Sequence, residues 1–140
     1  LEAMTESLGI YEGYICPVMD ARRAQVYNAL FSCRDGVIER LTPDRAIAVE
    51  ELEAELMSYS EKIYMSGDGY DICKKAFSKV ETANVPEIMR VQSGYSVCLC
   101  ALKDYKNGNT VTDKELSPSY LRLSQAERER NEKLNSGVKF

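Results

Sequence analysis

Two arginines and an aspartate stand together in the segment Asp20-Ala21-Arg22-Arg23, which joins two otherwise apolar runs. Guanidinium groups bind phosphates and carboxylates through paired hydrogen bonds, so Arg22 and Arg23 are candidate contacts for an anion or for a partner's acidic groups. Asp20 supports a structural interpretation as well, because its carboxylate can accept bonds from turn amides and pair with an arginine. Tyr27, in the run that follows, belongs to the same group of candidates. The residues leave both interpretations open.

A second group of candidates, Tyr120, Arg122, Glu127 and Arg128, lies near the end of the sequence. An extended Tyr-Leu-Arg segment suits a strap that packs back on the domain, with Arg122 reaching a carboxylate. It suits equally a segment that lies on another chain. Residues 124–134 alternate in charge and contain a single large apolar side chain, so we predict a tail that is disordered, or helical only when docked.

The third candidate is the turn Gly67-Asp68-Gly69, between a predicted strand and a predicted helix. Backbone amides in such a turn can bind a phosphate. This turn is shorter than a phosphate-binding loop, and it places a carboxylate where the anion would lie. We therefore favour a tight turn and keep ligand contact as the alternative.

The chain contains no histidine, which excludes Ser-His and Cys-His nucleophile pairs and histidine-ligated metals from what it can build alone. Asp20 and Asp68 could meet as a carboxylate pair at strand ends, as in two-metal nucleases. No further acid follows a strand in a comparable way. We expect no catalytic residues, no metal and no cofactor.

Composition predicts one globular domain: 140 residues, 44% hydrophobic and 29% charged, without an apolar stretch long enough to span a membrane. The five cysteines are an odd number among apolar neighbours, which favours reduced thiols and a cytoplasmic location. Residues 1–70 carry 13 acidic and 6 basic side chains, and residues 71–140 carry 9 and 12. Neither half has the dense basic surface that strong nucleic-acid binding requires.

The elements that position these residues follow from apolar spacing and turn residues. Asp35-Gly36 predicts a two-residue hairpin turn, because both positions of such a turn need a positive φ. Pro17 lacks an N–H group, so we place it at a bulge or an unpaired edge. The predicted order is a helix end over residues 1–8 closed by Gly9, strands over 14–19, 24–33 and 37–41, a loop or edge strand over 43–48, a helix over 49–59, a strand over 62–65, a helix over 70–78 and a short strand over 79–81.

The last predicted element is a helix of about five turns from Ile88 to Tyr105, whose apolar residues recur at spacings of three and four and are expected to face the core. Asn107-Gly108 ends it. The order of elements indicates an α/β fold of the ribonuclease H-like kind. We expect a half-domain, with a three-stranded antiparallel meander followed by crossover helices and short parallel strands over residues 1–115, and a strap over 116–140.

At four places the sequence resembles the bacterial TsaB (YeaZ) family. The stretch from Asp20 to Tyr27 is similar to that family's "DAR…eVY" signature, and Leu1-Glu2-Ala3 is similar to its "sLeaL" helix end. Leu116-Ser117-Pro118-Ser119-Tyr120-Leu121-Arg122, with Gln125-Ala126-Glu127-Arg128, resembles its closing "P-x-YLR…qAErer" segment. Gly67-Asp68-Gly69 resembles its "G-x-G" turn. These motifs occur in the family's order across nearly all of the sequence.

The resemblance implies the ASKHA superfamily and a role in threonylcarbamoyladenosine modification of tRNA. It implies a non-catalytic subunit that partners TsaD-like and TsaE-like proteins, with direct tRNA binding not expected. An ATP-dependent transferase or an M22-like peptidase of the same superfamily is the alternative, with Asp20 and Asp68 as its metal ligands.

The family's opening "IDTS"-like strand and "GPGSFTGLR" loop are not in these 140 residues, so the resemblance covers its C-terminal half. Since the sequence starts at Leu1 rather than methionine, we expect a processing point or a part of a longer protein. A half-sheet without its partner leaves apolar surface uncovered, so we also expect a homo-oligomer.

Overall fold

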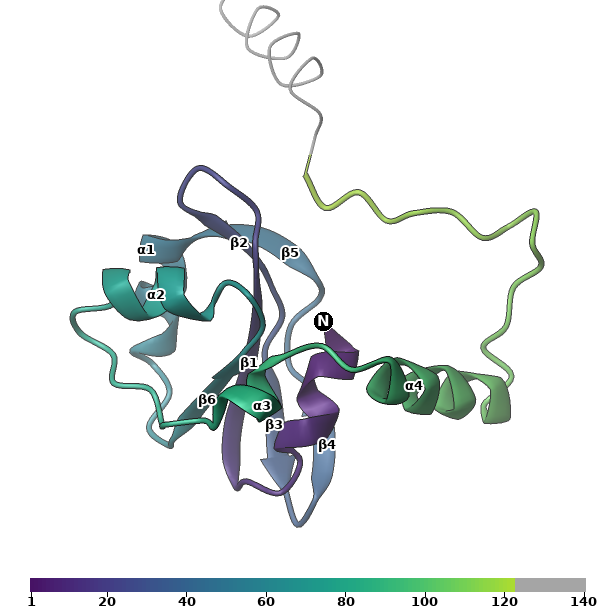
Figure 1. The fold of residues 1–140 in the computed structure, drawn as a ribbon, viewed down its shortest axis with the longest axis horizontal. Helices are drawn as coiled ribbons and strands as arrows, with labels where there is room; N and C mark the ends of the chain where they lie inside the picture. Colours follow the sequence, from purple (N-terminus) through teal and green to yellow (C-terminus); the bar gives the residue numbers. More distant parts are fainter. Residues whose placement is uncertain (123–140) are drawn as a thin grey trace, which may run out of the picture.

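A six-stranded mixed sheet forms the centre of the fold in the computed structural model, which describes residues 1–122 (Figure 1). The predicted tail with Glu127 and Arg128 lies outside the described residues. The strands are β1 (Gly13–Asp20), β2 (Gln25–Asn28), β3 (Phe31–Arg34), β4 (Val37–Arg40), β5 (Arg45–Ala48) and β6 (Ile63–Ser66). Their order is β4-β3-β1-β2-β5, with β6 also paired to β1.

β1 is the central strand, because it pairs antiparallel with β2 and β3 on one side and parallel with β6 on the other. Its side chains alternate between two apolar faces: Ile15 belongs to one core cluster, and Cys16 and Val18 belong to the other. A strand covered on both faces is expected to be almost continuously apolar, as residues 14–19 are. The expected mixed α/β sheet is therefore present.

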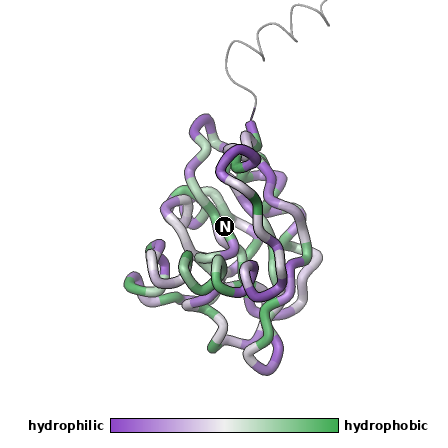
Figure 2. The backbone as a smooth tube through the Cα atoms, turned by 90° about the vertical axis from the view of Figure 1, so that its right-hand side faces the viewer, coloured by the Kyte–Doolittle hydropathy of each residue, from purple (hydrophilic) through white to green (hydrophobic). Residues whose placement is uncertain are grey.

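Helices cover both faces of the sheet. The helices α1 (Val49–Leu56) and α2 (Tyr70–Ala76) contribute Val49, Leu52, Leu56 and Cys73 to the core cluster on one face. The 3-10 helix η1 (Glu2–Leu8) buries Leu8 on the other face, where the short helix α3 (Glu87–Arg90) also lies. Several of the outer loops are hydrophilic (Figure 2).

The turn predicted at Asp35-Gly36 is confirmed. Both residues have a positive φ, +50° and +73°, and Arg34 pairs directly with Val37 across the turn. Such a turn matches the twist of the two strands it joins, which is why Asp-Gly forms it so readily.

Two strand predictions need correction. Residues 24–33 form two strands rather than one, because β2 ends at Asn28 and β3 begins at Phe31. Pro17 lies in the central strand rather than at an unpaired edge. It tolerates this position because the antiparallel partner of β1 changes there from β3, opposite Ile15, to β2, opposite Val18. The ladder is interrupted beside the residue that has no N–H to donate.

The predicted five-turn helix is also wrong. The chain forms α3, breaks at residues 91–93 and resumes as α4 (Gly94–Lys106). The apolar side chains expected to face the core are largely exposed, among them Ile88, Tyr95 and Tyr105. α4 leaves the body of the molecule and contacts it mainly through η1, so within residues 1–122 no layer covers its apolar side (Figure 1). The predicted end is confirmed, with Gly108 in a left-handed conformation at φ +76°.

Two short segments of the prediction remain, residues 79–81 and 43–48. Residues 79–81 form no strand, and the only further parallel pairing among residues 1–122 is an isolated bridge between Tyr64 and Ala83. Residues 43–48, which allowed either a loop or an edge strand, supply the edge strand β5. None of the helices in residues 1–122 is long and apolar enough to cross a membrane.

Candidate functional site

The three candidate groups predicted from the sequence meet at one edge of the sheet, which we call the hairpin edge: residues 20–23, 67–69 and 119–122. β1 and β6 are parallel, so the ends of both strands point to the same edge. The β1–β2 hairpin begins where β1 ends, and the glycine turn follows β6. In open α/β sheets, the carboxyl ends of parallel strands are the usual place for a binding site.

Hydrogen bonds to the backbone define the shape of the β1–β2 hairpin. Asp20 Oδ1 accepts the N–H of Arg22 at 2.7 Å, and Asp20 Oδ2 lies 3.5 Å from the Arg22 guanidinium. Three consecutive residues, Arg22, Arg23 and Ala24, have a left-handed φ of +65°, +54° and +55°. Left-handed backbone is energetically unfavourable for residues that have a side chain. The hydrogen bond from the Arg22 N–H to Asp20 offsets part of that cost.

The hairpin displays its two arginines to solvent. The Arg22 side chain is 85% exposed and Arg23 is also exposed. Among residues 1–122, Arg22 forms one ion pair, the long contact to Asp20, which leaves most of its five donors for another molecule.

The Gly67-Asp68-Gly69 turn packs tightly against β1. The N–H of Gly69 donates to the carbonyl of Val18 at 3.1 Å, and the N–H of Gly67 donates to the carbonyl of Arg90 at 2.7 Å. A Cβ on Gly67 would lie 2.0 Å from the Val18 carbonyl oxygen. Close backbone approach therefore explains both glycines, and their two amides, which could have bound an anion, already donate to carbonyls of the protein.

Asp68 joins this turn to the hairpin. Its Oδ1 accepts the N–H of Asp20 at 3.0 Å. The two aspartates predicted as a carboxylate pair are thus neighbours, but each contacts backbone amides. Among residues 1–122, no group of three histidine, cysteine or acidic side chains could hold a metal ion.

The third group reaches the hairpin through Arg122, whose Nη1 donates to the carbonyl of Ala21. The predicted partner of this arginine was a carboxylate, and the structure gives it a backbone carbonyl instead. Tyr27 and Tyr120 line one hollow of about 310 Å³ beside this contact, together with Met19 and Asp44. Tyr120 is 86% exposed, so its ring is available to a partner.

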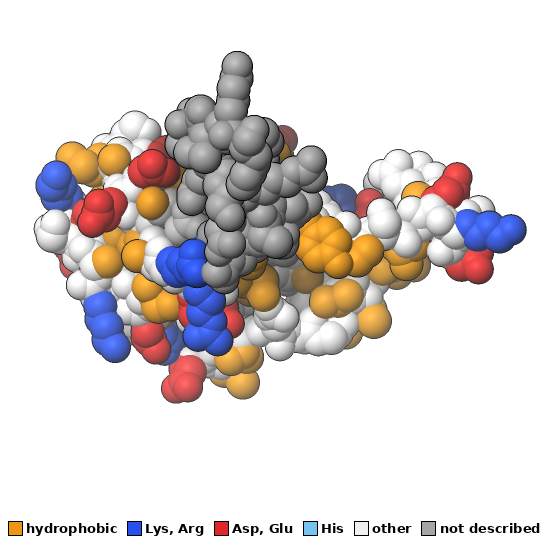
Figure 3. Space-filling model, turned by 90° about the horizontal axis from the view of Figure 1, so that it is seen from above, with side chains coloured by type: hydrophobic (Ala, Val, Ile, Leu, Met, Phe, Trp, Pro, Cys, Tyr) orange, Lys and Arg blue, Asp and Glu red, His pale blue; other side chains and the backbone are white. Residues whose placement is uncertain are grey.

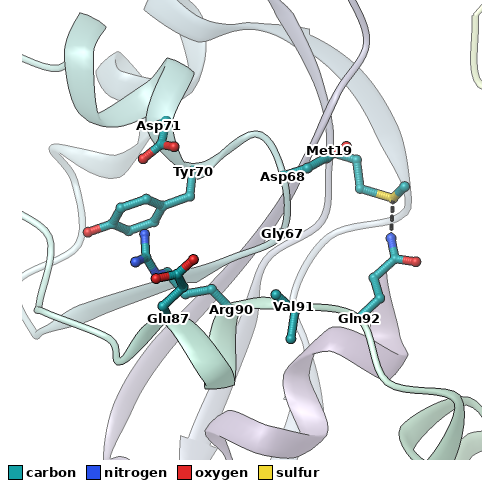
Figure 4. Close-up of a pocket in the computed structure, with 9 residues that line it drawn as sticks. All are labelled: Met19, Gly67, Asp68, Tyr70, Asp71, Glu87, Arg90, Val91 and Gln92. Atoms are coloured by element: carbon teal, nitrogen blue, oxygen red, sulfur yellow. Dashed lines mark hydrogen bonds between the residues drawn. The ribbon is translucent and has the colours of Figure 1, made fainter.

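A second hollow, of about 640 Å³, is also lined by Met19 (Figure 4). The Arg90 guanidinium stacks on the Tyr70 ring at 4.2 Å from its centre, and Glu87 lies beside them. Gln92 Nε2 donates to the Met19 sulfur at 3.4 Å across the mouth. Asp68 and Asp71 also line this hollow, so its acidic groups outnumber its one arginine.

Sequence reasoning missed Arg90 because it placed residues 88–105 in one core-facing helix. A signal was present: Arg90 is the only charged residue between Ile88 and Leu102. A single charge within so long an apolar segment requires a partner or solvent, which the Tyr70 ring and the hollow provide.

The buried cysteines offer no reactive thiol to this site. Burial raises the pKa of the Cys16 thiol far above its ordinary value and that of Cys73 to about 12. All five cysteines are free; Cys16, Cys33 and Cys73 are buried, and Cys98 is exposed. Thiols with a raised pKa carry little of the thiolate that reacts, so Cys16 and Cys73 act as core residues.

The chain is similar to one curated protein over most of its length. It is 27% identical, over 128 residues, to the tRNA threonylcarbamoyladenosine biosynthesis protein TsaB of Bacillus subtilis (strain 168). The match covers 91% of this chain and 55% of that protein. The chain therefore spans about half the length of the relative it matches. No family model matches the chain.

Two solved structures from Pseudomonas aeruginosa share the fold. An uncharacterized protein with similarity to peptidase YeaZ superimposes with a TM-score of 0.67 at 14% identity, over 87% of this chain and 56% of that one. The structure of YeaZ itself gives a TM-score of 0.61 at 13% identity, over 86% and 56%. Both again match this chain over about half of their own length.

Proposed function

We propose that the chain, which matches TsaB in sequence and YeaZ in fold over about half the length of each, acts in tRNA threonylcarbamoyladenosine biosynthesis. We assign it to the C-terminal half of such a protein and its sheet to one ribonuclease H-like half of a two-lobed architecture. In this proposal residues 1–115 form the subdomain, residues 116–140 form the strap, and the protein works in the cytoplasm.

The role we propose is that of a non-catalytic adaptor that binds another protein through the hairpin edge. The observation that carries this proposal is the free display of Arg22 and Arg23 on a hairpin whose shape is defined by Asp20 and Asp68. A preorganised turn loses little backbone freedom on binding, and guanidinium groups pair well with carboxylates.

Tyr120 extends this surface. It is exposed beside the hollow that Tyr27 lines, and Arg122 connects its segment to the hairpin. Aromatic and arginine side chains that lie together are the residues that most often dominate a protein interface. The partners we propose are TsaD-like and TsaE-like proteins, with acidic residues opposite Arg22 and Arg23.

A binding measurement tests this proposal. The tagged 140-residue chain should capture the TsaD-like or the TsaE-like protein of the same organism. Replacing both hairpin arginines, Arg22→Ala with Arg23→Ala, should weaken that binding about tenfold or more, because two charge-assisted contacts are lost. Failure to capture either protein would contradict the adaptor role.

The matched control removes two positive charges elsewhere. Lys75, on α2, and Lys79, after it, are exposed and line neither of the two hollows, so Lys75→Ala with Lys79→Ala should leave binding unchanged. Equal loss in both double variants would indicate a general charge effect. Magnesium-dependent ATP hydrolysis abolished by Asp20→Asn would instead favour the enzyme alternative.

A further inference from the structure

The larger of the two hollows lined by Met19, which we call the Arg90 hollow, contains an arginine without an acceptor. Arg90 is half-buried, its Nε is buried without a hydrogen-bond partner, and it forms no ion pair within residues 1–122. Buried polar groups are almost always paired. Stacking on the Tyr70 ring uses the face of the guanidinium and leaves its edge, where the other N–H groups lie, for an acceptor. A carboxylate is the acceptor that fits such an edge best.

Two carboxylates in the same hollow lack a cation. Asp71 and Glu87 line it, and neither forms an ion pair in the part of the chain that the structure describes. In the view of Figure 4, Asp71 lies above the Tyr70 ring and Glu87 below it. On the body of the molecule seen from above, by contrast, acidic and basic side chains are interspersed (Figure 3). An ammonium group, which has three donors and no acceptor, suits both carboxylates.

The Arg90 hollow also has an apolar wall. Met19 and Val91 form this wall, and the Val91 side chain is 55% exposed. The hydrogen bond from Gln92 to the Met19 sulfur links the two sides of the mouth. The volume of about 640 Å³ falls within the range of roughly 300–1,000 Å³ that is typical of small-molecule sites. An apolar side chain of a ligand therefore has both a surface to contact and the room to reach it.

The backbone holds these groups together before any ligand is present. The hollow lies where the parallel strands β1 and β6 end, which is the usual place for a ligand in an open α/β sheet. The N–H of Gly67, in the turn after β6, donates to the carbonyl of Arg90 at 2.7 Å. Tyr70 and Asp71 begin α2 directly after the same turn. One hydrogen bond thus joins the two segments that carry the charges, and groups that are already in place lose less freedom on binding.

We propose that the Arg90 hollow binds a small peptide-like zwitterion with an apolar side chain, either a free α-amino acid or a dipeptide. The ligand's carboxylate pairs with Arg90, and its ammonium group lies between Asp71 and Glu87. Its side chain contacts Met19 and Val91.

Simpler ligands match the hollow less well. An anion without an ammonium group would meet Asp71, Glu87 and also Asp68, whose Oδ1 already accepts the Asp20 N–H. An amine without a carboxylate would leave the half-buried Arg90 without an acceptor, at a cost in free energy. A zwitterion satisfies the groups of both signs.

Isothermal titration calorimetry of the 140-residue chain with leucine and with leucylleucine tests the proposal. At least one of the two should bind, and the tighter one identifies whether the ligand is an amino acid or a dipeptide. 4-Methylpentanoate, which lacks the ammonium group of leucine, and 3-methylbutylamine, which lacks its carboxylate, should each bind about tenfold or more weakly than leucine if leucine is the tighter ligand. If leucylleucine is tighter, its N-acetylated and its C-terminally amidated forms replace these two analogues.

Variants of the chain assign each charge of the ligand to its partner. Asp71→Asn with Glu87→Gln should weaken binding of the zwitterion about tenfold or more and leave binding of the analogue without an ammonium group unchanged. Arg90→Gln should weaken binding of the zwitterion and leave binding of the analogue without a carboxylate unchanged. Circular dichroism would verify the fold, and the acidic double variant keeps the test decisive if the loss of the Arg90 stack disturbs α3.

The matched control makes the same two chemical changes elsewhere. Glu39→Gln with Asp113→Asn removes two exposed carboxylates that do not line the hollow, so binding should stay as in the original chain. Equal weakening by both double variants would overturn the proposal. So would an amine analogue that binds as tightly as the zwitterion, or no binding of either zwitterion up to about 20 mM.

This proposal does not depend on the adaptor role. Arg22 and Arg23 do not line the Arg90 hollow, so Arg22→Ala with Arg23→Ala should leave binding of the zwitterion unchanged.

Discussion

Asn28 compensates for the proline in the central strand. The side chain is fully buried, and its Nδ2 donates to the carbonyls of Pro17 and Ala29 at 3.1 and 3.0 Å, where the strand ladder is interrupted. Its Oδ1 accepts a bond from Arg45 at 3.1 Å, and Arg45 pairs with Glu55 at 2.7 Å. Each buried polar group in this series therefore has a partner.

Replacing Asn28 with alanine should lower the free energy of unfolding by about 3 kcal/mol, because it leaves buried carbonyls unpaired and opens a small cavity. Urea unfolding measures the change. The control is Asn109→Ala at an exposed position, expected to change stability by less than about 0.5 kcal/mol. A loss below about 1 kcal/mol for Asn28→Ala would contradict this role.

Gly67 and Gly108 separate two reasons for a glycine. Both have a positive φ, +98° and +76°, but a Cβ would collide with the Val18 carbonyl at Gly67 and would meet nothing within 4 Å at Gly108. Gly67→Ala should therefore destabilise by about 3–5 kcal/mol, and Gly108→Ala by about 1 kcal/mol. Thermal or urea unfolding of the pair measures both. Similar losses would show that the close approach to β1 contributes little.

At the scale of elements, α1 is tied to the loop after α2 through Glu53. Its Oε1 accepts the backbone N–H groups of Ser78 and Lys79, each at 2.5 Å, and that of Val80 at 3.2 Å. The bond from Lys79 is the largest of the effects that lower the pKa of Glu53, and the bond from Ser78 adds to it. One carboxylate thereby organises three consecutive amides of a segment that forms no strand.

This contact predicts a pH dependence. A carboxyl group whose pKa is lower in the folded state stabilises the fold above its unfolded pKa, near 4.5, and loses that effect as the pH falls through the folded value. Glu53→Gln should therefore destabilise the protein at pH 7 and have little effect near pH 3. Unfolding at both pH values measures this difference.

Glu39→Gln serves as the control for this pH dependence. Glu39 is exposed on β4, and the substitution should have no pH-dependent effect on unfolding. An effect of Glu53→Gln that is equal at pH 7 and pH 3 would show that the charge of Glu53 does not contribute.

At the scale of the whole molecule, the net charge limits which kinds of partner the chain can bind. The net charge is −4, and the bases are not concentrated enough to neutralise many phosphates. The chain alone should therefore bind tRNA with a dissociation constant above about 100 µM at physiological salt. Filter binding or a gel shift over a salt series measures this. A salt-sensitive dissociation constant in the low micromolar range would contradict the prediction and would favour an RNA-binding surface.

Local chemistry made part of the fold predictable. Asp35-Gly36 forms its turn because two positive φ angles are cheapest at those residue types. α1 buries Val49, Leu52 and Leu56 at the predicted spacing, although it ends at Leu56 rather than at residue 59. The segment Asp20-Ala21-Arg22-Arg23 was recognisable as a hairpin connection for the same reason: a short polar run between two apolar ones. These features depend on neighbours in sequence.

The tertiary structure adds contacts between residues that are far apart in the sequence. Nothing in the residues near Asp20 or Asp68 specifies that one accepts the other's amide, or that Arg122 reaches Ala21. The same limit explains the error at α4, because apolar spacing identifies a face that avoids water but not the layer that covers it. Long-range packing decides which apolar faces are buried, and in residues 1–122 it leaves the apolar side chains of α4 exposed.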